Sequence, residues 1–118
     1  MKNMQAVAIF PKIAPENLEL FKVKMSQMLQ VIQGQETIVR YDVFFNSDST
    51  RCVVLEEYSI PEGVIEHVEK NAEILAELVS LGGAIDGSVF PFDQSGAALA
   101  EIRSGWDTKV HTFFAGKR

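Results

Sequence analysis

The sequence has one cysteine, no cluster of basic residues and no long apolar run, and each absence excludes a class of protein. The single cysteine, Cys52, allows neither an intrachain disulfide nor a zinc site built from several cysteines. The formal net charge of -5 and the scattered lysines and arginines argue against a nucleic-acid-binding surface. Apolar runs stay below the roughly 18 residues that a membrane span needs, so we expect no membrane partner.

Sequence motifs for several enzyme classes are also missing. The chain has no GxSxG nucleophile motif, no P-loop and no GxGxxG dinucleotide motif. Its two histidines, His67 and His111, lie too far apart in the sequence for a helical or strand pair of metal ligands, so we expect no metal. The N-terminal apolar run is too short for a signal peptide, and with the low cysteine count this favours a cytoplasmic protein.

What the sequence does contain is ordered hydrophobic periodicity over a length that can bury a core. With 118 residues we expect one domain over 1–118, with its core in 4–93 and a C-terminal extension in 94–118. The periodicity predicts these elements in order: strand 4–13, helix 15–33, strands 37–45 and 51–58, helix 61–81, strand 84–93, short helix 95–103 and strand 109–115. Asp93 or Ser95 is the expected cap of the short helix.

The order βαββαβ, with a tight turn at Asn46–Ser49, predicts a ferredoxin-like α+β fold with an antiparallel sheet. Such a sheet carries both long helices on one face and leaves the other face open. Most strands here are apolar on both faces, so an open face in water would be a large hydrophobic patch. We therefore expect a homodimer in which two sheets face one another, with the C-terminal strand extending an edge or reaching across.

Alternation divides the second predicted strand into two faces. Val39, Tyr41, Val43 and Phe45 fall on one face, and Ile38, Arg40, Asp42 and Phe44 fall on the other. The pattern does not fix the register of the hairpin, so Arg40 is placed opposite either Glu56 or Leu55.

The stretch from 51 to 81 holds the candidate site residues. Its strand ends in Glu56-Glu57-Tyr58, and its helix places His67 at the margin of an apolar face that includes Val64. Each of these side chains also has a plain structural interpretation, as a packed or solvated residue. Cys52, within the strand, is expected to be a small buried side chain.

Three segments resemble a known family, the antibiotic-biosynthesis-monooxygenase type, which includes small quinol monooxygenases. VVLEEYSIPEGVIEHVE resembles that family's third strand and second helix, in which a Glu-x-Tyr-type ending precedes a histidine by nine residues. GSVFPFD resembles the fourth strand, and FFAGKR resembles a subgroup with an added strand and a Gly-x-Arg-like end, here Gly116 and Arg118. The chain departs from the pattern at Ala72, where many members carry a second histidine.

The resemblance implies a dimeric α+β barrel and a cofactor-independent monooxygenase that oxidises a small aromatic or quinol-type molecule with O₂. It implies no flavin, haem or metal. The expected catalytic residues are His67 as base and Tyr58 as a group that orients a substrate hydroxyl. The expected substrate-binding residues are Glu56, Arg40, Phe44 and Val64. The alternative is a non-catalytic dimeric barrel that binds a small apolar ligand or has a structural role.

Overall fold

Five strands form one open sheet in the computed structural model, which describes residues 3–117. The strands are β1 (Met4–Phe10), β2 (Ile38–Phe45), β3 (Cys52–Tyr58), β4 (Asp86–Phe90) and β5 (Thr108–Val110), in the order β2-β3-β1-β4-β5. The pairs β2–β3, β3–β1 and β1–β4 are antiparallel, and the added pair β4–β5 is parallel. The predicted ferredoxin-like α+β order is confirmed, and within one chain the sheet does not close into a barrel.

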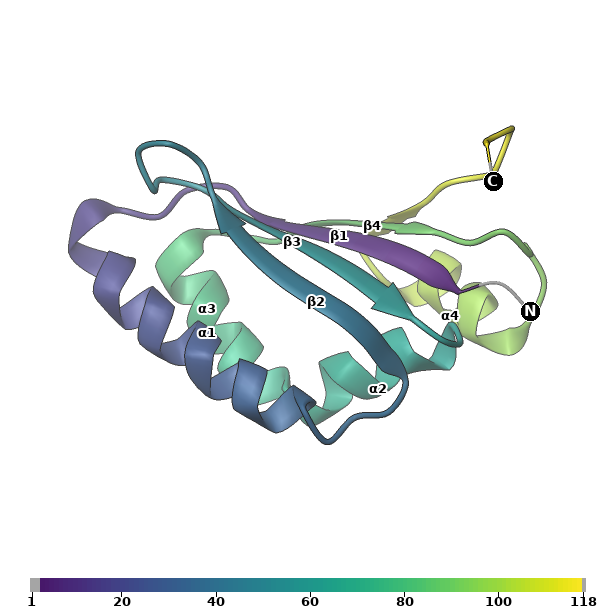
Figure 1. Ribbon diagram of the computed structural model, residues 1–118, viewed down its shortest axis with the longest axis horizontal. Helices are drawn as coiled ribbons and strands as arrows, with labels where there is room; N and C mark the ends of the chain where they lie inside the picture. Colours follow the sequence, from purple (N-terminus) through teal and green to yellow (C-terminus); the bar gives the residue numbers. More distant parts are fainter. Residues whose placement is uncertain (1–2, 118) are drawn as a thin grey trace.

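The helices of the described residues all lie against one face of this sheet (Figure 1). They are η1 (Pro15–Asn17), α1 (Leu18–Ile32), α2 (Glu62–Lys70), α3 (Ala72–Gly82) and α4 (Ala97–Gly105). None of these helices is long and apolar enough to cross a membrane.

The helix predicted over 61–81 is wrong in one respect, because it breaks at Asn71. Asn71 has φ -113° and ψ 18° and joins α2 to α3. Its side-chain amide donates to the carbonyl of His67, a local bond that competes with regular helix hydrogen bonding. The predicted stop is confirmed: α3 ends at Gly82, and Gly83 follows with φ +91°, a conformation that favours glycine.

The hairpin register differs from both predicted alternatives. Arg40 lies opposite Glu57, and Tyr41 lies opposite Glu56. A register shift between Ile38 and Arg40 also reverses the predicted facing at the start of β2. Ile38 packs against the core, and Val39 is 54% exposed. Simple alternation fails here because a bulge inserts one extra residue into the strand.

The C-terminal segment is less regular than predicted. Strand β5 ends at Val110, and residues 111–117, here called the C-terminal arm, continue as irregular chain on the side of the sheet away from the helices (Figure 1). The predicted cap of α4 is wrong, since its N-cap residue is Gly96 and the Asp93 carboxylate accepts hydrogen bonds from Ser95 instead. Arg118 lies outside the described residues.

Two apolar clusters fill the space between the sheet and the helices. The larger contains Phe10, Phe21 and Cys52, and the rings of Phe10 and Phe21 meet edge to face at 5.1 Å. Cys52 is buried, as predicted. The smaller cluster surrounds Tyr58 and Leu99 near α2 and α4. The cavity described below lies where these clusters meet.

The other face of the sheet carries no helix and is called the open face. Its apolar side chains are Val7, Ile9, Phe44, Val53, Leu55 and Phe90, which the strand pairing places side by side. Phe44 is 52% exposed and Phe90 is 39% exposed.

Candidate functional site

A cavity of about 90 Å³ lies between the sheet and helices α2 and α3. Its walls are largely apolar, and its ionisable lining residues are Tyr41, Glu56, Tyr58 and His67. Apolar cavities that hold benzene are larger, about 150 Å³, so a ring-sized ligand requires lining side chains to move. A few polar groups in an apolar cavity are the usual composition of a small-molecule site.

Glu56 is the most unusual of these groups, because it is a buried carboxyl without a cationic partner among the described residues. Its side chain is 6% exposed and points toward the helices from β3. Burial raises the Glu56 pKa to about 7, against a smaller lowering by the hydroxyl of Tyr58, which donates to Oε1 at 2.5 Å. With this pKa, the Glu56 carboxyl changes between its protonated and ionised forms near neutral pH.

Tyr58 owes its position to the alternation of β3 and to a glycine on α2. It is fully buried two residues beyond Glu56, on the same face. A Cβ added to Gly63 would lie 2.9 Å from Cδ1 of Tyr58, so only glycine allows the start of α2 to approach the ring this closely. Burial and the neighbouring Glu56 both raise the pKa of Tyr58, which keeps its hydroxyl protonated and able to donate.

His67 reaches the cavity from α2 and contacts Tyr41. Its Nε2 lies 3.2 Å from the Tyr41 hydroxyl, and the two rings meet edge to face at 5.1 Å. Burial lowers the His67 pKa to about 4, so the ring is neutral at pH 7. Burial, and then the charge of Glu56, raise the pKa of Tyr41 well above its ordinary value. The pKa values favour Glu56 over His67 as the proton acceptor.

The structure brings four of the predicted site residues together and separates two. His67, Tyr58, Glu56 and Val64 line the same cavity. Arg40 and Phe44 point the other way, onto the open face.

Arg40 and Phe44 therefore do not line this cavity within one chain, and the substrate-binding role expected of them stays a prediction. Arg40 instead pairs with Asp42 on its own strand, with Nε 3.4 Å from Oδ2, and both side chains are about half exposed. The register explains this placement, because Arg40 and Phe44 pair with residues of β3 that face away from the helices.

Sequence reasoning missed Tyr41 and Asn71. Alternation grouped Tyr41 with Val43 and Phe45 on one face of β2, but only the register shows that Tyr41 lies across from Glu56. Asn71 follows His67 by four residues, a spacing at which helical side chains meet, and its Nδ2 lies 3.2 Å from Nδ1 of His67. That spacing was available in the sequence. Among residues 3–117 no group of three histidine, cysteine or acidic side chains is arranged to hold a metal ion.

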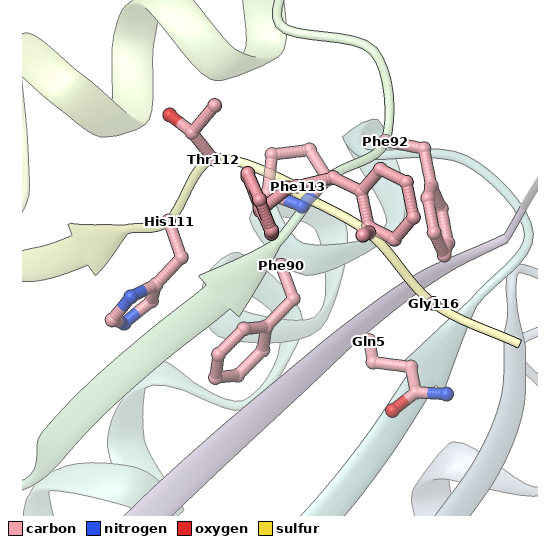
Figure 2. A pocket seen from close by; sticks show the side chains of 10 residues that line it. Gln5, Phe90, Phe92, His111, Thr112, Phe113 and Gly116 are labelled. Carbon is pink, nitrogen blue, oxygen red and sulfur yellow. The ribbon is translucent and has the colours of Figure 1, made fainter.

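A second hollow lies on the open face, beneath the C-terminal arm (Figure 2). It measures about 400 Å³ and is lined by Gln5, Phe90, Phe92 and residues of the arm. The His111 ring stacks on Phe90 at 4.6 Å, and its Nε2 lies 3.2 Å from the Ser88 hydroxyl. The lining of this hollow includes no buried ionisable group, so it is better suited to packing against another apolar surface than to acid–base chemistry.

No family model and no curated protein matches this chain, but solved structures match most of its length. MupZ from Pseudomonas fluorescens aligns with a TM-score of 0.83 at 18% identity, over 100% of this chain and 95% of its own. Rv0793 from Mycobacterium tuberculosis aligns with a TM-score of 0.68 at 17% identity, over 80% of this chain and 100% of its own. A structure described as an antibiotic biosynthesis monooxygenase aligns with a TM-score of 0.64 at 17% identity, over 79% of this chain and 99% of its own. The chain thus has the antibiotic-biosynthesis-monooxygenase-type fold that the sequence resemblance predicts.

Proposed function

We propose that the cavity is the active site of a cofactor-independent monooxygenase that acts on a small aromatic or quinol-type molecule. The observation that carries the proposal is Glu56, a buried carboxyl whose pKa of about 7 suits it to take a proton from a weakly acidic substrate. The name of one neighbour with the same fold, antibiotic biosynthesis monooxygenase, supports O₂ as the second substrate.

The reaction begins with proton transfer from the substrate to Glu56. The substrate anion then reduces O₂ and forms a carbon–oxygen bond, and the Glu56 proton completes a hydroperoxide. For a CH₂ group, loss of water from the hydroperoxide leaves a carbonyl, so one oxygen atom enters the substrate and the other leaves in water. The substrate supplies both hydrogens of that water and all four electrons, so no further reductant is needed.

The surroundings of Glu56 suit each step. Tyr58 donates to one carboxyl oxygen and holds the group in place, and Val64 contributes to the apolar wall. An apolar wall keeps water away from the anion and strengthens the interactions that stabilise it. Tyr41 and His67 supply a second polar contact opposite Glu56.

The active form in this proposal is a cytoplasmic homodimer joined through the open face. The face is apolar over its central strands, β1 and β3, where Val7 lies directly opposite Leu55. Phe114 of the C-terminal arm is 98% exposed, and Phe113 is 44% exposed. Burial of such side chains against a second copy would stabilise the pair at roughly 25 cal/mol per Å² of apolar area, before the cost of association.

Oxygen uptake by the purified, metal-stripped protein tests the proposed reaction. With a panel of anthrones, quinols and catechols, we expect at least one compound to consume O₂ faster than its uncatalysed autoxidation. The consumption should be stoichiometric with one oxygenated product and should not respond to added flavin or metal. If the whole panel reacts at the uncatalysed rate, the proposal fails and a non-catalytic ligand-binding barrel becomes the better account.

A further inference from the structure

Asn71 is a buried polar residue that does not line the cavity, and it touches His67 twice. Its Nδ2 lies 2.9 Å from the carbonyl oxygen of His67 and 3.2 Å from Nδ1 of the His67 ring. A carbonyl oxygen can only accept a hydrogen bond, so the amide group must present its nitrogen here. The same nitrogen carries a second hydrogen, which faces Nδ1. The break between α2 and α3 places Asn71 in this position.

These contacts determine where the imidazole of His67 carries its proton. Because Nδ1 faces a donor, it must accept, and the single proton of the neutral ring lies on Nε2. Nε2 then donates to the Tyr41 hydroxyl oxygen, 3.2 Å away. The hydroxyl hydrogen of Tyr41 is thereby left free to donate to another group.

The strand register determines which groups the hydroxyl hydrogen of Tyr41 can reach. Tyr41 lies directly opposite Glu56 on the neighbouring strand, and both line the cavity. Tyr58 already donates to Oε1 of Glu56. A substrate held beside the carboxyl would therefore meet a proton acceptor, Glu56, and a separate hydrogen-bond donor, Tyr41.

We propose that Asn71 is a positioning residue: it holds His67 as the Nε2-protonated tautomer, and so makes the Tyr41 hydroxyl a donor to the oxyanion of the substrate. This inference rests on the proposed function for the identity of the oxyanion. In this proposal two residues have separate roles: Glu56 takes the proton, and Tyr41 stabilises the negative charge left on the substrate. A preorganised donor at such a position contributes about 10²–10³-fold in rate.

The tautomer can be measured without any substrate. We expect ¹⁵N NMR of histidine-labelled protein at pH 7 to show His67 neutral and protonated on Nε2. The variant His111→Gln, which changes only the exposed histidine, assigns the signals. A His67 that is protonated on Nδ1, or charged at pH 7, overturns the proposal whether or not the protein consumes O₂.

Asn71→Asp tests the consequence for turnover. A carboxylate can only accept, so it should draw the proton to Nδ1, leave Nε2 to accept from Tyr41 and remove the free donor. We expect kcat to fall by about 10²–10³-fold with little change in KM, and the His67 pKa to rise. The NMR experiment should show the reversed tautomer.

A double-mutant cycle with Tyr41→Phe shows whether Asn71 acts through the hydroxyl. If it does, Asn71→Asp costs almost nothing further in kcat once the hydroxyl is gone. If the two fold-losses in kcat multiply in the double variant, Asn71 does not act through the Tyr41 hydroxyl, and the proposal is overturned. If Asn71→Asp does not fold, the tautomer of the wild-type protein still decides the proposal. If no substrate is found, the proposed function fails while the tautomer result stands on its own.

Discussion

Glu56→Gln is expected to lower kcat by about 10²–10⁴-fold, the usual contribution of a positioned acid–base group. Glutamine has nearly the same shape and still accepts the hydrogen bond from Tyr58, but it cannot take a proton. Steady-state oxygen uptake with the best compound of the panel gives the comparison. Glu57→Gln is the matched control, because the neighbouring carboxylate points to the open face, away from the cavity. Equal loss in both variants, or no loss in Glu56→Gln, contradicts the assignment.

The same substitution should make the protein more stable at alkaline pH. The Glu56 pKa rises from 4.5 when solvated to about 7 in the fold, so the folded state holds more protons between these values. Stability of the wild-type protein therefore falls as pH rises from about 4.5 through 7, by a total on the order of 3 kcal/mol. Glu56→Gln lacks this loss.

Urea denaturation at several pH values measures the effect. The two proteins should differ little near pH 4.5, and the variant should be more stable above pH 7. A wild-type protein whose stability relative to Glu56→Gln does not change between these pH values would show that Glu56 is not a buried carboxyl with a raised pKa.

Leu55→Glu should convert the proposed dimer to monomer. Leu55 lies on β3 in the middle of the open face, opposite Val7, so a second copy packed there would have to bury the new charge unpaired. We expect the dimer to weaken by at least about 30-fold, the loss typical of an interface hot spot. Sedimentation equilibrium over a range of protein concentrations measures it.

Leu20→Glu is the matched control for that experiment. It places the same charge at a side chain of α1 that is 49% exposed, on the helical side of the molecule. The control should keep the mass of the wild type. A wild-type protein that sediments as a monomer, or a Leu55→Glu dimer of unchanged affinity, contradicts an interface through the open face.

Much of the fold could be predicted from the sequence, because periodicity and turn chemistry are local. The apolar stripe of α1, the hairpin turn and the pair Gly82-Gly83 at the end of α3 each act through near neighbours. The predictions that were wrong concern positions whose structure depends on contacts that no local sequence pattern indicates. The bulge near Ile38 changed the register of β2, and the side chain of Asn71 broke a helix whose apolar periodicity continues through it.

The candidate site was partly predictable for the same reason. Glu56, Tyr58 and His67 stand out in one short stretch. Strand alternation puts Glu56 and Tyr58 on the same face, and helix periodicity puts His67 at the margin of an apolar face. The proton-accepting role expected of His67 rested on its ordinary pKa, and the fold changes that pKa by burying the ring. The opposite shift at Glu56 has the same cause, since burial disfavours whichever form is charged.

The most direct test of the account is the titration of the Glu56 carboxyl by ¹³C NMR in protein labelled at the glutamate side chains. The signal lost in Glu56→Gln identifies the group. The account predicts a midpoint near pH 7, well above the ordinary value of a glutamate. A midpoint between about 4 and 5, the range of solvated glutamates, would leave the carboxylate too weak a base for the proposed proton transfer and would contradict the central claim.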